Sequence, residues 1–260
     1  MGTSRETLLD RLDGGDHIVS ENEADQLTST GSQIAPGIAR DLSELARRLQ
    51  DERDPAQVAQ MIVDATITNI PHATWAGITL VESGRFRTPV QTGGTIVARI
   101  DEIQYDLDEG PCVRAAVSKR AVLSNDLAND GRWPNFGPAA STFGVRAMLS
   151  FQLFVESDSL GALNLYAQEA NVFDDDDEHV GLLLAAHSGV ALADARQIAQ
   201  MHLALQSRDV IGRAKGILME RYKISDQAAF ELLIAASHRT HRKLRDVADE
   251  LSRTGDLGID

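Results

Sequence analysis

The sequence predicts an α+β protein: an antiparallel sheet with flanking helices, followed by a long connecting helix and a bundle of three short helices. Three observations lead to this prediction. Apolar residues recur at helical spacing over residues 38–65, form strand-like runs within residues 74–166, and return to helical spacing from residue 180 onward. Helices that flank an antiparallel sheet are the arrangement of an α+β domain.

The N-terminal segment, residues 1–37, is rich in Ser, Thr, Asp, Glu and Gly and has little periodicity, so we expect a disordered acidic arm. A first helix is expected where apolar residues follow helical spacing, at Ile38, Leu42, Leu45 and Leu49. A second helix should follow, because Asp54 suits an N-cap and Pro55 suits the first helical position. Its expected apolar stripe is Val58, Met61, Ile62 and Ala65.

The middle of the chain changes to a strand-like pattern. Residues 74–81 are apolar, partly β-branched and closed by Ser83-Gly84, and residues 86–90 fit a hairpin partner. Residues 96–105 are ambiguous, and Gly110-Pro111 interrupts the segment. We expect a short strand at 121–123 and two clear strands at 145–155 and 160–166, joined across residues 156–159.

A long helix should then begin at the acidic run 174–177, because carboxylates stabilise the free N–H groups and positive dipole of a helix N-terminus. Eight residues follow a heptad seam: Val180, Leu184, His187, Ala191, Asp194, Ile198, Met201 and Leu205. The first turns either pack on the chain's own sheet or join this seam. The later turns predict a two-stranded coiled coil, and thus a homodimer in which His187 and Asp194 set the register.

Three helices are expected at the C-terminal end. No Gly or Pro separates residue 207 from the long helix, so that helix should continue through Arg221. Ser225 suits the N-cap of a second helix, on which Phe230, Leu233 and Ser237 share one face. The third helix should begin near Thr240 and end before Gly255. Its expected buried residues are Leu244, Val247, Ala248 and Leu251.

The charge is unevenly distributed along the chain. The formal net charge is −14, yet residues 201–260 hold 10 Lys and Arg against 9 Asp and Glu, a net of +1. A nucleic-acid-binding face needs only local positive charge, so the acidic whole does not exclude one. The single cysteine, Cys112, cannot form an internal disulfide, and neither a membrane-length apolar run nor a secretory signal is visible. We therefore expect a cytoplasmic protein.

Basic residues gather at two places in the C-terminal part. Arg208, Gly212, Lys215 and Met219 share one helix face, with Gly216 beside Lys215. A glycine inside a helix costs about 1 kcal/mol relative to alanine, which suggests a close approach by another helix or by a ligand. Residues 238–245 contain four Lys or Arg and two His. This stretch either grips phosphates at a helix start or is a solvated basic turn.

The C-terminal motifs resemble the ANTAR family. They are residues 207–221 (Ser-Arg-Asp-Val-Ile-Gly-Arg-Ala-Lys-Gly-Ile-Leu-Met-Glu-Arg), Ala228-Ala229-Phe230, Ser237 and residues 242–248, with matching spacing over about fifty residues. The resemblance implies a three-helix module that binds paired hairpins in nascent mRNA leaders and stabilises an antiterminator. The implied RNA-binding residues are Arg208, Arg213, Lys215, Gly216, Met219, Arg242 and Lys243. Ala214 is expected to pack inside, and Arg213 points away from the Arg208–Lys215 face.

Residues 38–195 resemble a GAF domain. The features that carry the resemblance are residues 108–112 (Asp-Glu-Gly-Pro-Cys), 122–127 (Val-Leu-Ser-Asn-Asp-Leu), Arg132-Trp133-Pro134 and residues 161–166. This resemblance implies a sensor domain with a small-molecule ligand, whose identity and cofactor stay unknown. A cyclic-nucleotide pattern is only half present, because Phe173, Asp177 and Glu178 fit it whereas Asn125 is followed by Asp126.

Enzymatic chemistry is not expected. The sequence shows no Ser-His-Asp set, phosphate-binding loop or dinucleotide-binding glycine pattern at a strand–helix junction. Cys112 is interpreted as a small buried hydrophobe rather than a redox thiol. The acids at 174–178 are interpreted as caps, and no catalytic residue or metal site is predicted.

The domain plan follows from these elements: an arm at 1–37, a GAF-like sensor at 38–195, a coiled-coil connector at 196–206 and an ANTAR domain at 207–260. The expected function is RNA-binding transcription antitermination under sensor control. The alternatives are a DNA-binding helix-turn-helix regulator and a dimerisation module that binds no nucleic acid. The basic residues do not follow one recognition helix, which favours RNA over DNA.

Overall fold

The computed structural model describes residues 36–82, 84–118, 121–155 and 158–256. The expected arm lies almost wholly outside them. Helices α2 (Pro36–Asp51) and α3 (Pro55–Asn69) begin the described chain. The Asp54 side chain accepts a hydrogen bond from the backbone N–H of Ala56, which confirms the predicted N-cap. The buried stripe of α3 is Val58, Ala59, Ile62, Val63 and Thr66, so Met61 and Ala65 lie at its edge.

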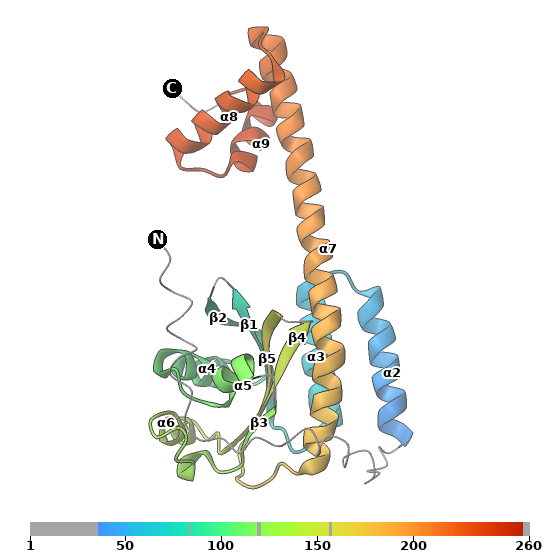
Figure 1. The fold of residues 1–260 in the computed structure, drawn as a ribbon, viewed down its shortest axis with the longest axis vertical. Coiled ribbons are helices and arrows are strands. Elements are labelled where there is room, and N and C mark those ends of the chain that lie inside the picture. Colours follow the sequence, from blue (N-terminus) through green and yellow to red (C-terminus); the bar gives the residue numbers. More distant parts are fainter. Residues whose placement is uncertain (1–35, 83, 119–120, 156–157, 257–260) are drawn as a thin grey trace. The chain divides into compact units, whose positions relative to one another are not determined.

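Five antiparallel strands form one sheet in the order β2-β1-β5-β4-β3 (Figure 1). The strands are β1 (Trp75–Glu82), β2 (Arg85–Gln91), β3 (Ala121–Ser124), β4 (Ala147–Val155) and β5 (Asp158–Ala167). Hence the predicted hairpins and the predicted pairing of the two long strands are confirmed. The central strand β5 pairs with both β1 and β4, so both of its edges are hydrogen-bonded within the sheet.

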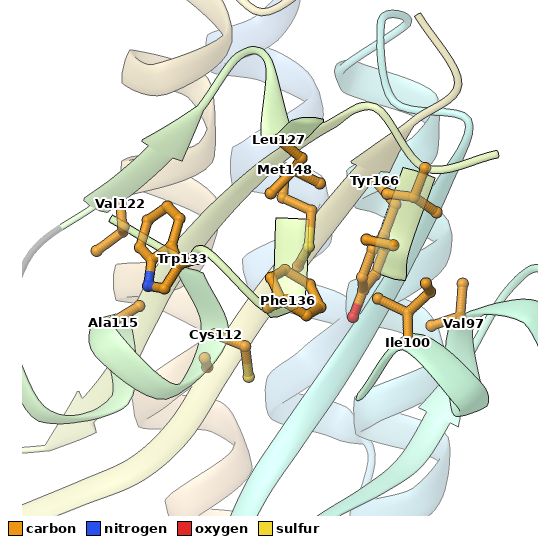
Figure 2. Close-up of a cluster of buried hydrophobic side chains, with 13 residues drawn as sticks. Val97, Ile100, Cys112, Ala115, Val122, Leu127, Trp133, Phe136, Met148 and Tyr166 are labelled. Carbon is orange, nitrogen blue, oxygen red and sulfur yellow. The ribbon is translucent and has the colours of Figure 1, made fainter. Parts of the chain in front are cut away.

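Helices α4 (Thr95–Leu107), α5 (Pro111–Ser118) and α6 (Phe136–Thr142) cover one face of the sheet, with a short 3-10 turn at Leu127–Asn129. The segment 96–105, ambiguous in the sequence, is therefore helical. Pro111 does not only end the preceding segment; it begins α5, because proline suits the first helical position. The core beneath these helices includes Ile100, Cys112, Phe136, Met148 and Tyr166 (Figure 2).

The opposite face of the sheet is covered by α3 and by the start of α7 (Asp175–Tyr222). Two glycines allow α7 to approach β4 closely. A Cβ at Gly181 would lie 2.1 Å from the Phe151 ring, and a Cβ at Gly189 would lie 2.7 Å from the Phe154 carbonyl oxygen. Consequently, the first turns of α7 pack on the chain's own sheet, with Val180 and Leu184 buried there.

Helix α7 continues without a break for 48 residues. Its N-terminus is a reciprocal capping box between Asp174 and Asp177. It ends at Lys223, which adopts the left-handed conformation. The predicted continuity from the sensor segment to Arg221 is thus confirmed. Among the described residues, no helix combines the length and apolar character needed to cross a bilayer.

The C-terminal module consists of the end of α7, α8 (Asp226–Thr240) and α9 (Leu244–Thr254). Its buried core is Ala214, Leu218, Ala229, Leu233, Ala236, Val247, Ala248 and Leu251. The prediction that the third helix begins near Thr240 is wrong. Helix α8 continues to Thr240 because His238 and Arg239 suit the negative end of its dipole, and His241 then ends it in the left-handed conformation.

Candidate nucleic-acid interface and sensor interior

A groove lies along the C-terminal part of α7 and the start of α8; we call it the α7–α8 groove. Its volume is 810 Å³. It is lined by Ala204, Ser207, Arg208, Asp209, Ile211, Gly212, Arg213, Lys215 and Phe230. Three cations and one carboxylate therefore share this surface, which gives it a local positive charge within an acidic chain.

Lys215 is the cation held most firmly in this groove. Its Nζ lies 2.6 Å from Oδ1 and 2.8 Å from Oδ2 of Asp226, at the start of α8. It also lies 5.8 Å from the centre of the Phe230 ring. Lys215 is 23% exposed and Asp226 is 65% exposed, so water reaches the pair mainly on the acid side. The ion pair fixes the position of Lys215 at the wall of the groove and places the Asp226 carboxylate beside its ammonium group.

Arg208 and Arg213 are both exposed. Helix geometry alone separates Arg213 from the Arg208–Lys215 face, yet all three residues line the same groove. The structure therefore brings together three of the predicted RNA-binding cations.

Gly212 and Gly216 are exposed positions inside α7. A Cβ at either glycine would meet no other atom within 4 Å among the described residues. No helix of the described chain therefore needs these positions to be glycine. Close packing against another helix of the described chain therefore does not explain Gly216, and the approach of a ligand stays a prediction.

Two neighbouring motif residues serve packing. Ala214 is completely buried in the core of the module, as predicted. Met219 is partly buried and packs against the same core. Folding thus accounts for much of the Met219 side chain, and its assignment to RNA stays a prediction.

Arg242 and Lys243 lie in the turn between α8 and α9, and both are exposed. The Arg242 guanidinium forms an ion pair with Glu250. Lys215 meets the beginning of α8, whereas Arg242 follows its end, and a 15-residue helix is about 22 Å long. The predicted RNA-binding residues therefore form two separate basic sites.

Sequence reasoning missed the roles of Asp226 and Phe230. It placed Phe230 with Leu233 on one apolar face, but only Leu233 belongs to the buried core. Phe230 is partly exposed and lines the groove. The one available signal was the position of Phe230 in the first turns of its helix, four residues after Asp226 and so on the same helix face.

The interior of the sensor segment holds a buried carboxyl group, Asp101 of α4. Its oxygens accept hydrogen bonds from the Thr88 hydroxyl at 2.6 Å, the Tyr166 hydroxyl at 2.6 Å and the Gln104 amide at 3.2 Å. Burial raises the pKa of Asp101 to about 6, although these hydrogen bonds act in the opposite direction. The signal in the sequence was its place beside Val97 and Ile100, on the apolar face of an amphipathic helix.

Cys112 joins the same polar network. Its thiol lies 3.3 Å from the Thr79 hydroxyl and accepts a hydrogen bond from the Asn164 amide at 3.2 Å. The side chain is fully buried, and burial raises the pKa of Cys112 to about 12. The expectation of a buried, weakly reactive thiol agrees with this environment, because the thiolate is the reactive form.

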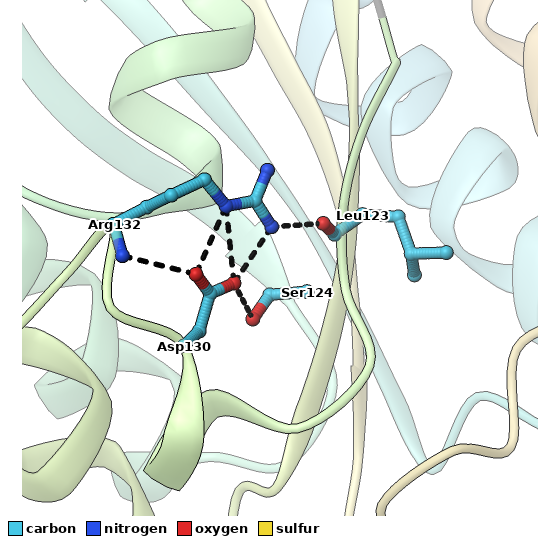
Figure 3. Close-up of polar contacts among 4 residues, drawn as sticks. All are labelled: Leu123, Ser124, Asp130 and Arg132. Atoms are coloured by element: carbon cyan, nitrogen blue, oxygen red, sulfur yellow. Dashed lines mark hydrogen bonds and ion pairs between the residues drawn. The ribbon is translucent and has the colours of Figure 1, made fainter.

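The Arg132-Trp133 motif fixes the loop that follows β3 (Figure 3). Arg132 Nη2 donates hydrogen bonds to Asp130 Oδ2 and to the Leu123 carbonyl, each at 2.6 Å. Its guanidinium also stacks 4.3 Å from the centre of the Trp133 ring. Burial favours the neutral form of Asp130, but the hydrogen bonds from Arg132 and Ser124 outweigh it and lower the pKa of Asp130. The motif is therefore structural here.

One cluster of possible metal ligands occurs among the described residues: His72, Asp174 and Asp177, with ligand atoms within 4.8 Å of one another. His72 Nδ1 lies 2.7 Å from Asp177 Oδ2. Both carboxylates already form the capping box of α7, so the structure gives each a structural partner. The hydrogen bond that the His72 ring donates to the Asp177 carboxylate raises the pKa of His72.

A second groove, of 330 Å³, lies between the end of α2 and α7; we call it the α2–α7 groove. Five residues of the predicted coiled-coil seam line it: His187, Ala191, Asp194, Ile198 and Met201. Apolar side chains continue beyond it, where Leu203 and Leu205 are 51% and 59% exposed. Hence the part of the seam that the sheet does not cover is open.

Comparison with known proteins identifies both parts of the chain. The family model of the GAF domain matches residues 52–193, and that of the ANTAR domain matches residues 199–251. No curated protein matches the chain.

Among solved structures, the GAF domain of a phosphoenolpyruvate-protein phosphotransferase from Coxiella burnetii has a TM-score of 0.50 at 15% identity, covering 63% of this chain and 96% of that one. The equivalent domain from Acinetobacter has a TM-score of 0.50 at 12% identity, covering 63% and 97%. Free methionine-R-sulfoxide reductase from Neisseria meningitidis has a TM-score of 0.47 at 17% identity, covering 62% and 90%. At these identities, the two domains with a TM-score of 0.50 show a likeness of fold alone.

The five-stranded sheet with its helical layers agrees with the first match, and the three-helix module with the second. Because the GAF model covers more than half of the sequence, the chain belongs to the GAF domain family and carries an ANTAR domain at its C-terminal end.

Proposed function

We propose that this chain is a cytoplasmic transcription antitermination regulator whose ANTAR domain binds paired hairpins in nascent mRNA leaders under control of the GAF domain. The observation that carries the proposal is the α7–α8 groove, where Arg208, Arg213 and Lys215 line one surface inside the ANTAR match. Lys and Arg side chains that neutralise phosphates provide most of the affinity for nucleic acid.

The distribution of charge supports RNA rather than DNA. In a helix-turn-helix regulator, α9 would enter the major groove as the recognition helix. Yet α9 carries Arg245 and Arg253 against Asp246, Asp249 and Glu250, a net negative charge. The basic residues lie instead on α7 and in the α8–α9 turn, so the expected recognition helix has no basic face for a duplex.

The proposed regulator is a homodimer. The α2–α7 groove and the exposed apolar residues that follow it on α7 give a partner helix a surface to cover. In a two-stranded coiled coil, this seam would bring two ANTAR domains together. Two domains in one dimer match two hairpins in one leader, because the second contact benefits from a raised effective concentration.

The GAF domain is proposed as a sensor of a small molecule rather than as an enzyme. The only thiol of the sequence is buried and its pKa is raised, so the reactive thiolate form is disfavoured. A ligand can regulate RNA binding if it favours one arrangement of the domain over another.

The test is a gel shift with the full chain. The probe is an RNA with two short hairpins, selected against the protein from a pool with randomised loops, and it is compared with duplex DNA of the same sequence. We expect a stable complex with the RNA, weaker binding to the DNA, and a loss of affinity in Arg242→Ala. Equal binding to both nucleic acids, or none to either, would overturn the proposal.

A further inference from the structure

Phe230 is an aromatic side chain that the core of the ANTAR domain does not enclose. The buried core around it uses Ala229 and Leu233 of the same helix. Phe230 itself is partly exposed and lines the α7–α8 groove. Full burial of an apolar side chain of this size stabilises a fold by about 1.5–3 kcal/mol. A phenylalanine at the surface lacks part of that stabilisation.

Cations share the groove with this ring, beside one lining carboxylate, Asp209. Lys215 Nζ lies 5.8 Å from the ring centre, and Arg208 and Arg213 line the same groove. The ion pair with Asp226 holds Lys215 over one face of the ring, which leaves the other face for a stacked group. An aromatic ring can stack with a planar group, and the adjacent cations can bind an anion attached to that group.

The wall of the groove is open at Gly212. A Cβ at this position would meet nothing within 4 Å, and the residue is exposed. The missing side chain leaves room for a flat group to approach the backbone of α7. Thus the groove combines a ring to stack on, cations beside it, and a wall without a side chain.

We infer that the α7–α8 groove is a site for one unpaired nucleobase of an RNA hairpin loop, stacked on Phe230, with its phosphates near Arg208 and Lys215. This inference rests on the proposed function and names the part of the RNA that the site recognises. Unpaired loop bases are splayed out and stack on aromatic side chains in sequence-specific RNA recognition. A closed stem offers no such base, so the site would distinguish a loop from a duplex.

The experiment compares three full-length proteins: the parent, Phe230→Leu and a matched control, Leu232→Ala, which changes an exposed apolar residue on the same helix outside the groove. The probes are the selected two-hairpin RNA and a blunt duplex of the same stem. We expect Phe230→Leu to bind the hairpin RNA about 5- to 150-fold more weakly, the range that one base–aromatic stack supports. Binding to the stem duplex should not change, and neither should hairpin binding by Leu232→Ala.

A second measurement uses the parent protein alone. Loop uridines are replaced by 5-iodouridine, and irradiation should crosslink one loop position to Phe230, located by mass spectrometry of the peptides. An abasic sugar at that position should weaken binding by the same factor as Phe230→Leu, and the two losses should not multiply. This keeps the inference testable even where Phe230→Leu unfolds the domain.

The outcomes separate the inference from the proposed function. If no selected RNA binds better than duplex DNA, the proposed function fails and the inference fails with it. If the RNA binds but Phe230→Leu binds equally well and crosslinks map elsewhere, only the base site is wrong. A loss that is equal for hairpin and stem duplex would assign Phe230 to folding or to another partner and would also overturn the inference.

Discussion

Lys215 has a structural contact and a proposed RNA contact, because the same ammonium group pairs with Asp226 and lines the α7–α8 groove. Lys215→Ala should weaken binding to the two-hairpin RNA and reduce the slope of log affinity against log salt by about 0.7–0.9, the contribution of one phosphate contact. The stability of the domain should change by less than about 1 kcal/mol, because exposed ion pairs contribute little. Fluorescence anisotropy across a salt series measures both quantities.

Lys223→Ala is the matched control, since Lys223 is exposed at the end of α7 and lies outside the groove. It removes the same charge from the same protein. If both variants lose the same affinity and slope, general charge rather than the groove attracts the RNA.

A substitution of Gly216 should change the stability of the domain and its affinity for RNA in opposite directions. Because a Cβ there meets nothing in the described chain, Gly216→Ala should stabilise the domain by about 1 kcal/mol through helix propensity. If RNA approaches this backbone, the added methyl group should weaken binding by about 1–3 kcal/mol, the cost of extra atoms in a packed contact. Denaturant unfolding and anisotropy give the two values. A stabilised variant with parental affinity would remove Gly216 from the interface.

Asp101 makes the stability of the GAF domain depend on pH. Its pKa is about 6 in the folded protein against an ordinary 3.8, so the folded state holds the proton more tightly than the unfolded state. Stability from this group is therefore greatest below pH 3.8 and is lost as the pH rises through 6, by about 3 kcal/mol in all. Roughly 1 kcal/mol of this loss falls between pH 5 and 7.5.

Asp101→Asn should remove that dependence. Between pH 5 and 7.5, the free energy of unfolding of the parent should fall relative to that of Asp101→Asn. Denaturant unfolding at each pH measures both values. Asp106→Asn, an exposed change on the same helix, controls for general charge effects. A constant difference across this range would mean that Asp101 keeps an ordinary pKa in the folded domain.

At the scale of elements, helices and strands with regular patterns were predictable and those with polar interior residues were not. Residues 96–105 were ambiguous because Asp101 and Gln104 occupy buried positions of α4, where a sequence pattern expects apolar side chains. The end of α8 was misplaced because His238 and Arg239 suit the end of a helix as well as the start of the next one.

The candidate site was predictable only in part for a related reason. Periodicity identified Arg208 and Lys215 on one face of a helix, which depends on local spacing alone. The contact of Lys215 with Asp226 and Phe230 depends on how α8 packs against α7, and no local pattern contains that information.

The open seam of α7 carries the prediction about assembly. Ile198 lines the α2–α7 groove, so Ile198→Asp would place an unpaired charge in the proposed interface and should convert dimers into monomers. Sedimentation velocity measures the change. Gln200→Asp, an exposed change on α7 outside that groove, should remain dimeric. A dimeric Ile198→Asp protein would move the interface onto another surface.

At the scale of the whole molecule, one helix belongs to both domains. Helix α7 packs on β4 at Gly181 and Gly189 and supplies Ala214 and Leu218 to the ANTAR core. Its backbone hydrogen bonds run unbroken between these points. A change at the sheet can therefore reach Arg208 and Lys215 as a rotation or shift of the helix itself, without a flexible joint that would absorb it.

An insertion that rotates one domain against the other tests this coupling. Two alanines after Gln200 turn the following helix by about 200°, whereas seven turn it by about 700° and so restore the face to within about 20°. We expect the two-residue insertion to lose tight binding to the two-hairpin RNA and the seven-residue insertion to recover part of it. Both variants keep every residue of the two cores, so circular dichroism should show unchanged folding. Binding to a single hairpin serves as the control, because it needs only one ANTAR domain and should stay at the parental level in both. If both insertions bind the two-hairpin RNA like the parent, α7 is a passive tether and the GAF domain must act on RNA binding by another route, such as direct masking of the groove.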